Sequence, residues 1–203
     1  MNLLELADKY LTDKGTNFFD KAPGEGHMYA PVYELFLSHL RDKSINLLEI
    51  GIAKGASLCM WQEYFKNGTI VGLDITLEHI DRSRPQGVEG GGWPDPDTIV
   101  LKQGSQVDAN VLDSIFNEYK SFDVVIDDGS HFNEHQQFTF KHIWPKLRSG
   151  DIYIIEDIHY EKQNENSTLN SIFKIMMNIG SFECQFMNIL YTDADSITCI
   201  LKK

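Results

Sequence analysis

Two apolar runs, each followed by acidic residues, constrain the possible fold more than any other feature of the chain. Residues 122–126 and 151–155 are the runs, and a helix-like stretch at 133–147 lies between them. Continuous apolar runs are typical of strands buried on both faces of a parallel sheet. A helix between two such strands predicts a βαβ unit with neighbouring parallel strands, so four carboxylates are expected at one edge of the sheet. These carboxylates are Asp127, Asp128, Glu156 and Asp157.

Carboxylates crowded at one edge repel one another unless a cation or raised pKa values relieve them. A single acidic cluster after a strand is more often a turn or a helix start. Here two clusters follow consecutive strands, and His131 and His159 lie within three residues of them. That combination favours a functional site. Oxygen ligands suit Mg²⁺ or Mn²⁺ better than Zn²⁺, so a divalent metal site is predicted.

Composition limits the classes of function. A chain of 203 residues, 42% hydrophobic and 24% charged, is expected to form one globular domain over residues 1–203. The net charge of -12 argues against nucleic acid or an anionic membrane as a partner. Charged residues interrupt MNLLELADKY, which predicts neither a signal peptide nor a membrane span. Three cysteines without metal or redox spacing fit reduced thiols, so a cytoplasmic location is expected.

Strand and helix patterns alternate along the chain, which predicts an α/β fold with a mostly parallel, doubly wound sheet. Two runs near the end of the chain predict a C-terminal antiparallel hairpin. The expected strands are 46–50, 69–73, 98–102, 122–126 and 151–155, the hairpin is 186–191 with 196–201, and a helix is expected at 169–179. Glycines and prolines at 82–97 predict a long loop. Trp93 in this loop could close over a ligand or lie loosely packed on the surface.

The first expected strand leads into the turn LLEIGIAKGASL. Gly51 allows a tight turn there, and Gly55 lets a ligand approach the start of the following helix. Asp74 ends the second expected strand, where a carboxylate can accept hydrogen bonds from both hydroxyls of a ribose. This layout is shared by nucleotide-binding α/β proteins.

The same turn departs from phosphate-binding patterns. A dinucleotide fingerprint needs a glycine where the chain has Ala53, and the sequence GxxxxGK[ST] is lacking. An acidic residue before the first glycine, here Glu49, is instead usual in enzymes that use S-adenosylmethionine. That cofactor has no phosphates and needs less anion-binding machinery.

Seven motifs carry a more specific resemblance over about residues 11–160. The set KYLTDKGT, HMYAPVYE, LLEIGIAKGASLCMW, GLDI, GSQVD, VVIDDGSH and IYIIEDIH resembles the metal-dependent macrolide and rhamnosyl sugar O-methyltransferases. These are class I S-adenosylmethionine-dependent methyltransferases, and a cephalosporin hydroxylase-like protein shares their core. The resemblance implies a Rossmann-like core at residues 46–203. It also implies an N-terminal helical segment, residues 1–45, that covers the cofactor.

The resemblance also implies a cofactor set, S-adenosyl-L-methionine with Mg²⁺ or Mn²⁺, and roles for single residues. His131 matches the general base of the family. The matching metal ligands are Asp128, Glu156 and Asp157. The positions implied to bind the cofactor are Thr12, Lys14, Tyr29, Glu49, Gly51, Gly55, Ser57, Asp74, Ser105, Gln106 and Asp127.

The expected reaction is transfer of a methyl group to a hydroxyl of a sugar or glycosylated small molecule. A metal chelated by adjacent hydroxyls lowers their pKa, and a histidine with a pKa near 6.5 can then remove the proton. Two alternatives stay open: a catechol-like or other small diol as acceptor, and a non-catalytic accessory protein that binds S-adenosylmethionine. His135 is a second candidate base or a helix-surface residue, and His159 could contact the acceptor. A homo-oligomer is left open.

Overall fold

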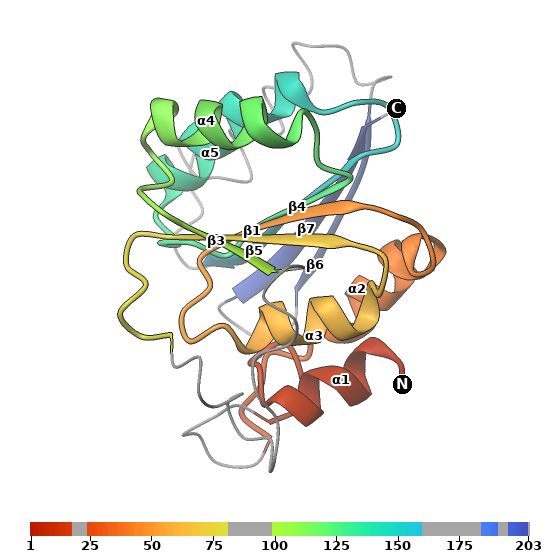
Figure 1. Cartoon of the computed structure of the whole chain (residues 1–203). Helices are drawn as coiled ribbons and strands as arrows, with labels where there is room; N and C mark the ends of the chain where they lie inside the picture. The colour runs from red at the N-terminus through yellow and green to blue at the C-terminus, as the bar shows by residue number, and fades with distance from the viewer. Residues whose placement is uncertain (18–23, 81–98, 160–183, 191–194, 203) are drawn as a thin grey trace.

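The computed structural model describes residues 1–17, 24–80, 99–159, 184–190 and 195–202 (Figure 1). The elements in chain order are α1 (Leu3–Tyr10), α2 (Ala30–Leu37), the 3₁₀ turn η1 (Ser38–Leu40), β1 (Asn46–Ile50), α3 (Ala56–Tyr64), β2 (Thr69–Asp74), β3 (Ile99–Gln103), α4 (Ala109–Tyr119), β4 (Val124–Asp127), α5 (Asn133–Ile143), the 3₁₀ turn η2 (Trp144–Lys146), β5 (Ile152–His159), β6 (Cys184–Leu190) and β7 (Asp195–Lys202). The loop expected at 82–97, with Trp93, and the helix expected at 169–179 lie outside the described residues.

The strands form a seven-stranded sheet in the order β3-β2-β1-β4-β5-β7-β6. Strands β1 to β5 run parallel, and β7 pairs antiparallel with both β5 and β6. The expected doubly wound sheet with a C-terminal antiparallel pair is therefore confirmed. The strand order reverses between β1 and β4, which is the switch point where ligands bind in open α/β sheets.

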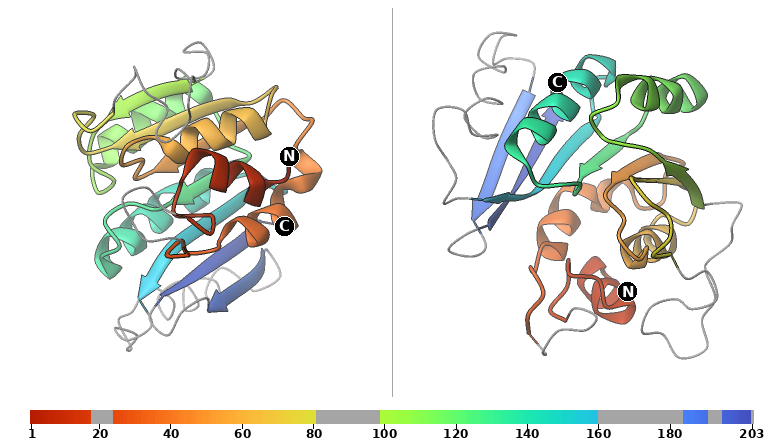
Figure 2. Two further views of the ribbon diagram at one scale, coloured as in Figure 1. Left: turned by 90° about the horizontal axis from the view of Figure 1, so that it is seen from below. Right: turned by 90° about the vertical axis from the view of Figure 1, so that its left-hand side faces the viewer.

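Helices cover both faces of the sheet, with α1, α2 and α3 on one face and α4 and α5 on the other (Figures 1 and 2). Alternate residues of each central strand enter different cores because successive strand side chains point to opposite faces. Along β4, Val124 and Ile126 pack with the first group of helices, whereas Val125 packs with the second. Burial on both faces is why these strands read as continuous apolar runs.

Local sequence signals set several helix ends. Asn2 and Glu5 form a reciprocal capping box at the start of α1, and Leu11 ends that helix in a left-handed conformation. Asp108 caps α4 by accepting a hydrogen bond from the backbone N–H of Asn110. Within the described residues, none of the helices combines the length and the hydropathy of a membrane-spanning segment.

Strand β5 differs from the prediction in a way that matters for the acidic residues. Its expected end at Ile155 was wrong, because pairing with β7 continues as far as His159. The register shifts between Ile155 and Ile158, where β5 carries one residue more than β7, and Asp157 adopts a left-handed backbone with φ of 49°. Such a bulge interrupts the alternation of side chains between the two faces. Strand β4 also begins two residues later than expected, at Val124.

Gly51 lies where the turn after β1 meets the turn after β4. Its φ is +82°, and a Cβ atom added there would stand 1.9 Å from the carbonyl oxygen of Asp128. Gly150 has a similar φ of +94°, but a Cβ atom there would meet nothing within 4 Å. An alanine at either position would have a strained left-handed backbone, but only an alanine at Gly51 would also crowd its neighbours. Comparing the two positions therefore distinguishes backbone strain from crowding.

We expect Gly51→Ala to lower the free energy of unfolding by about 2–5 kcal/mol, since strain and overpacking add. Gly150→Ala should cost only about 1–2 kcal/mol, the penalty of the left-handed backbone alone. Urea unfolding of both variants measures the difference. Equal losses in the two variants would show that the turns do not press against each other at Gly51.

Candidate functional site

A cavity of about 300 Å³ opens at the carboxyl ends of β1, β2 and β4. It lies at the switch point of the sheet, between the turn that follows β1 and the N-terminal segment that links α1 to α2. The predicted site residues that line it are Thr12, Lys14, Gly51, Ser57, Asp74, Asp128 and His131. Residues from the N-terminal segment and from three strand ends thus surround one space.

A second cavity of about 170 Å³ adjoins the first. Gly51, Asp74 and Gly129 line both cavities, and Ser105 and Gln106 line the second. Two cavities with shared walls suit an elongated ligand that crosses the ends of β1 and β2.

Asp74 holds the turn that follows β1. Its Oδ2 accepts hydrogen bonds from the backbone N–H groups of Ile52, at 2.9 Å, and of Ala53, at 3.1 Å. Ala53 has a left-handed backbone with φ of 43°, and Gly55, the N-cap residue of α3, has a φ of 86°. The carboxylate therefore fixes the turn and also faces both cavities. Its predicted contact with a ribose stays a prediction.

Gln106 bridges the turns that follow β3 and β4. Its Nε2 donates to Asp127 Oδ1 at 3.0 Å and to Thr139 Oγ1 at 3.1 Å, while its Oε1 accepts from the backbone N–H of Ser130. Asp127 is fully buried. This burial raises its pKa to about 7, although the hydrogen bond donated by Tyr153 lowers the pKa. Asp127 therefore lies behind Gln106, on the α4–α5 side of the sheet and away from the other acids.

Lys14 lies in the centre of the acidic cluster on the opposite side. Its Nζ is 2.6 Å from Asp128 Oδ2, 3.0 and 3.1 Å from the two oxygens of Glu156, and 3.5 Å from Glu49 Oε1. Burial disfavours the ammonium, but Asp128 and Glu156 raise the pKa of Lys14 well above its ordinary value. The cation that the crowded carboxylates require is therefore supplied in part by the chain itself.

Glu49 projects from β1 into the same cluster. Ser57 Oγ donates to its Oε2 at 2.7 Å, and burial raises the pKa of Glu49 to about 7. Its Oε1 is buried and makes no hydrogen bond among the described residues.

Two tyrosines one helical turn apart hold the two acids of the β5 bulge. Tyr29, at the start of α2, donates to Asp157 Oδ1 at 2.8 Å, and Tyr33 donates to Glu156 Oε1. Because Glu156 and Asp157 both reach the same helix, the bulge has brought consecutive side chains to one face of the sheet. The role of Tyr33 was missed by the sequence analysis, although its spacing of four residues from Tyr29 placed both on one helix face.

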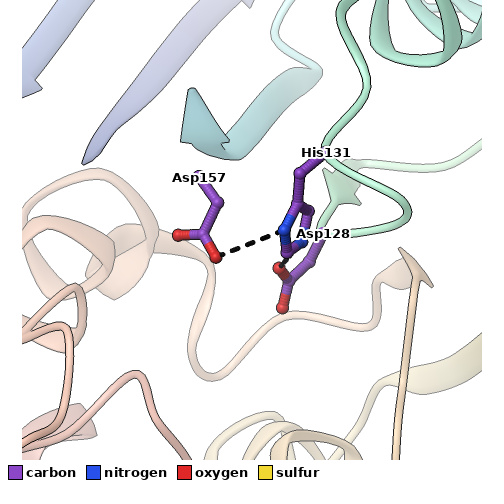
Figure 3. A group of neighbouring side chains, drawn as sticks. All are labelled: Asp128, His131 and Asp157. Atoms are coloured by element: carbon purple, nitrogen blue, oxygen red, sulfur yellow. Dashed lines mark hydrogen bonds and ion pairs between the residues drawn. The ribbon is translucent and has the colours of Figure 1, made fainter. Parts of the chain in front are cut away.

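His131 stands between two carboxylates (Figure 3). Its Nε2 is 3.3 Å from Asp128 Oδ1, and its Nδ1 is 3.7 Å from Asp157 Oδ2. Burial alone would lower the pKa of His131, but Asp128 and Asp157 raise it to about 9, above the 6.5 on which the sequence argument relied. His131 has a left-handed backbone with φ of 58°, like Asp157. Backbone strain of this kind gathers at functional sites.

Asp157 has a second histidine beside it. His27 Nδ1 lies 3.3 Å from Asp157 Oδ1. Burial opposes ionisation of Asp157, yet His27, His131 and Tyr29 hold its pKa below the ordinary value. This carboxylate is therefore ionised and available as an anionic ligand.

The acids fall into two groups that share Asp128. Among the described residues, ligand atoms of Asp128, His131 and Asp157 lie close enough for one ion, and so do those of Glu49, Asp128 and Glu156. The predicted metal triad of Asp128, Glu156 and Asp157 is thus brought to one region but divided between these groups. Lys14 Nζ faces the second group.

The side chain of His135 lies on the wall of the second cavity and its Nδ1 is 2.6 Å from Ser130 Oγ. Among the described residues, no hydrogen bond joins the His135 imidazole to the acidic cluster. His159 ends β5.

The chain matches a protein family described as "Methyltransferase domain" over residues 48–158. It is 37% identical over 164 residues to 8-demethyl-8-(2-methoxy-alpha-L-rhamnosyl)-tetracenomycin-C 3'-O-methyltransferase of Streptomyces olivaceus, which covers 77% of this chain and 37% of the relative. It is 36% identical over 165 residues to mycinamicin VI 2''-O-methyltransferase of Micromonospora griseorubida, covering 77% of this chain and 36% of the relative. The chain therefore spans little more than a third of the length of these relatives.

A solved structure shares the fold of this chain. The MycE methyltransferase from the mycinamycin biosynthetic pathway, in complex with Mg, SAH and mycinamycin VI, superposes with a TM-score of 0.74 and 28% sequence identity. The match covers 100% of this chain and 54% of that one.

Proposed function

Because this chain belongs to the methyltransferase domain family, we propose that it is an S-adenosylmethionine- and Mg²⁺-dependent O-methyltransferase that acts on a hydroxyl of a sugar or glycosylated small molecule. One observation carries the proposal: the cavity at the switch point and the acidic cluster around His131 share a wall, formed by Lys14, Asp128 and His131. The name of the relative that is 37% identical places a rhamnosyl sugar in its substrate, which supports the choice of acceptor.

The cavities fit the proposed cofactor. Their joined shape suits an elongated molecule, and Asp74 faces the shared part, where it can accept hydrogen bonds from a ribose. Lys14 and Lys54 line the larger cavity and could pair with an amino-acid carboxylate there. S-adenosylmethionine carries the methyl group on a sulfonium sulfur, so transfer breaks the bond between that sulfur and the methyl carbon, and S-adenosylhomocysteine is the leaving group.

The acidic cluster fits a hard divalent cation. Its donors are carboxylate oxygens with one imidazole, and the buried Glu49 Oε1 makes no hydrogen bond among the described residues. We assign Asp128, Glu156 and Asp157 as the residues that would hold the ion. When bound, Mg²⁺ lowers the pKa of a chelated hydroxyl.

Each residue of the site has its own role in the proposed reaction. Asp74 fixes the turn after β1 and orients the ribose, and Tyr29 and Tyr33 hold the two acids of the bulge in place. His131 lies beside Asp128 at the cavity wall and takes the proton of the acceptor hydroxyl. The hydroxyl oxygen forms its bond to the methyl group as this proton leaves. Asp128 and Asp157 raise the pKa of His131, and a cation bound to these two carboxylates would lower it again by offsetting their negative charge.

The proposal is tested by a screen of acceptors that measures release of S-adenosylhomocysteine with and without Mg²⁺. Glycosides with adjacent free hydroxyls are expected to be methylated only with Mg²⁺, and the same glycosides with one of the two hydroxyls blocked serve as controls. Turnover of catechols alone would favour the small-diol alternative. Cofactor binding without turnover of any acceptor class would favour an accessory protein. A cytoplasmic location and the absence of nucleic-acid partners stay predictions.

A further inference from the structure

Lys14 is a buried cation, and two of its carboxylate partners, Asp128 and Glu156, are also residues that we propose hold the metal ion. Its side chain is 1% exposed, and its Nζ lies within 3.1 Å of both oxygens of Glu156 and 2.6 Å from Asp128 Oδ2. Both oxygens of Glu156 are therefore engaged with the ammonium, and Oε1 also accepts from the Tyr33 hydroxyl.

A divalent cation held by Asp128 and Glu156 would need the same oxygens. Mg²⁺ binds carboxylate oxygens at about 2.1 Å, so an ion on Glu156 would lie close to Nζ and the two positive charges would repel each other. Repulsion is strong in a buried site because little water screens it. Glu156 can therefore join a metal site only when Lys14 turns away from it.

The larger cavity offers Lys14 another direction. Lys14 lines this cavity beside Thr12 and Asp13, in the turn that links α1 to α2. Apart from His131, the cationic side chains on the wall of this cavity, within the described part of the chain, are those of Lys14 and Lys54. A carboxylate bound in this cavity would give the Lys14 ammonium a new anionic partner.

We propose that Lys14 couples the two ligand sites: the α-carboxylate of the cofactor draws the ammonium away from Glu156 and Asp128, which frees both acids for the divalent cation. This inference rests on the proposed function. Lys14 acts here as a positioning residue, and the coupling must be reciprocal, so that the metal also tightens binding of the cofactor.

Calorimetric titration with Mn²⁺ tests the coupling in the unmodified protein. The titration is run alone, with saturating S-adenosylhomocysteine, and with saturating 5′-methylthioadenosine, which keeps the nucleoside but lacks the amino-acid end. S-adenosylhomocysteine should tighten Mn²⁺ binding by roughly 5- to 150-fold, the usual range of coupling between sites. 5′-Methylthioadenosine should leave the affinity unchanged, because it offers Lys14 no carboxylate.

Two matched variants assign the effect to a residue. Lys14→Met keeps the length of the side chain but removes the charge, so Mn²⁺ affinity should no longer depend on S-adenosylhomocysteine. Lys54→Met should keep the dependence. If Lys14→Met fails to fold, the contrast between the two nucleosides in the unmodified protein decides the question.

Three results would overturn the inference. One is equal Mn²⁺ affinity under all three conditions while both ligands bind, which leaves the proposed function standing. Another is loss of coupling in Lys54→Met rather than in Lys14→Met. A protein that binds neither Mn²⁺ nor S-adenosylhomocysteine would remove the proposed function and this inference with it.

Discussion

Replacement of His131 by alanine is expected to lower kcat by about 10²- to 10⁴-fold, the usual contribution of a general base. His131 is the histidine that both lines the larger cavity and contacts Asp128, at 3.3 Å, and Asp157, at 3.7 Å, among the described residues. Its removal leaves the three acids intact, so binding of Mn²⁺ and S-adenosylhomocysteine should persist. Rates are measured with a glycoside identified by the acceptor screen.

Two other histidines sharpen this test. His142→Ala is the control, because His142 pairs with Asp113, stacks on Phe138 and is not among the residues that line either cavity. It should leave kcat within a few-fold of the unmodified protein. His135→Ala tests the second candidate base. If His131→Ala retained nearly full turnover and His135→Ala lost it, the proton acceptor would be His135.

Chelation of divalent cations by EDTA is expected to abolish turnover, and added Mg²⁺ should restore it. Asp157→Asn keeps the shape of the side chain but removes the negative charge that His27, His131 and Tyr29 stabilise. A Lewis acid contributes several kcal/mol to such a reaction, so kcat should fall by about 10²-fold or more at limiting Mg²⁺. Excess Mg²⁺ or Mn²⁺ should rescue it in part.

The control for this variant is Asp108→Asn, the same chemical change at the start of α4. Asparagine caps a helix as well as aspartate does, so stability and activity should be retained. In the absence of divalent cations, S-adenosylhomocysteine binding should be nearly equal in both variants, since the cavity is built mainly on other strands. Full turnover after exhaustive chelation would show that the carboxylates serve only to hold the fold, and the metal assignment would fail.

The sequence predicted the fold because the signals it relies on are local. Apolar runs such as 122–126 mark strands buried on both faces, and helical spacing between them indicates parallel neighbours. Gly51 and Gly55 after β1, and Asp74 at the end of β2, predicted the site at the switch point, because residues at strand ends are also a local signal. Strand ends were predicted less well, because the end of β5 depends on how far β7 pairs with it.

The tertiary structure decided how the acids are grouped. Asp127 and Asp128 are neighbours in sequence, yet Asp127 contacts Gln106 on one side of the sheet and Asp128 contacts Lys14 on the other. Glu156 and Asp157 share a side only because of the bulge. No local pattern reveals a bulge that arises from pairing with a strand some forty residues away.

The sequence by itself determined the order of strands and helices and the collection of carboxylates at one sheet edge, since both follow from short-range patterns and from parallel pairing. Only the tertiary structure placed Lys14 among those carboxylates, across a separation of 114 residues from Asp128. Electrostatic contacts between distant segments leave no periodic trace in a sequence. They are set by how the N-terminal segment packs over the ends of the strands.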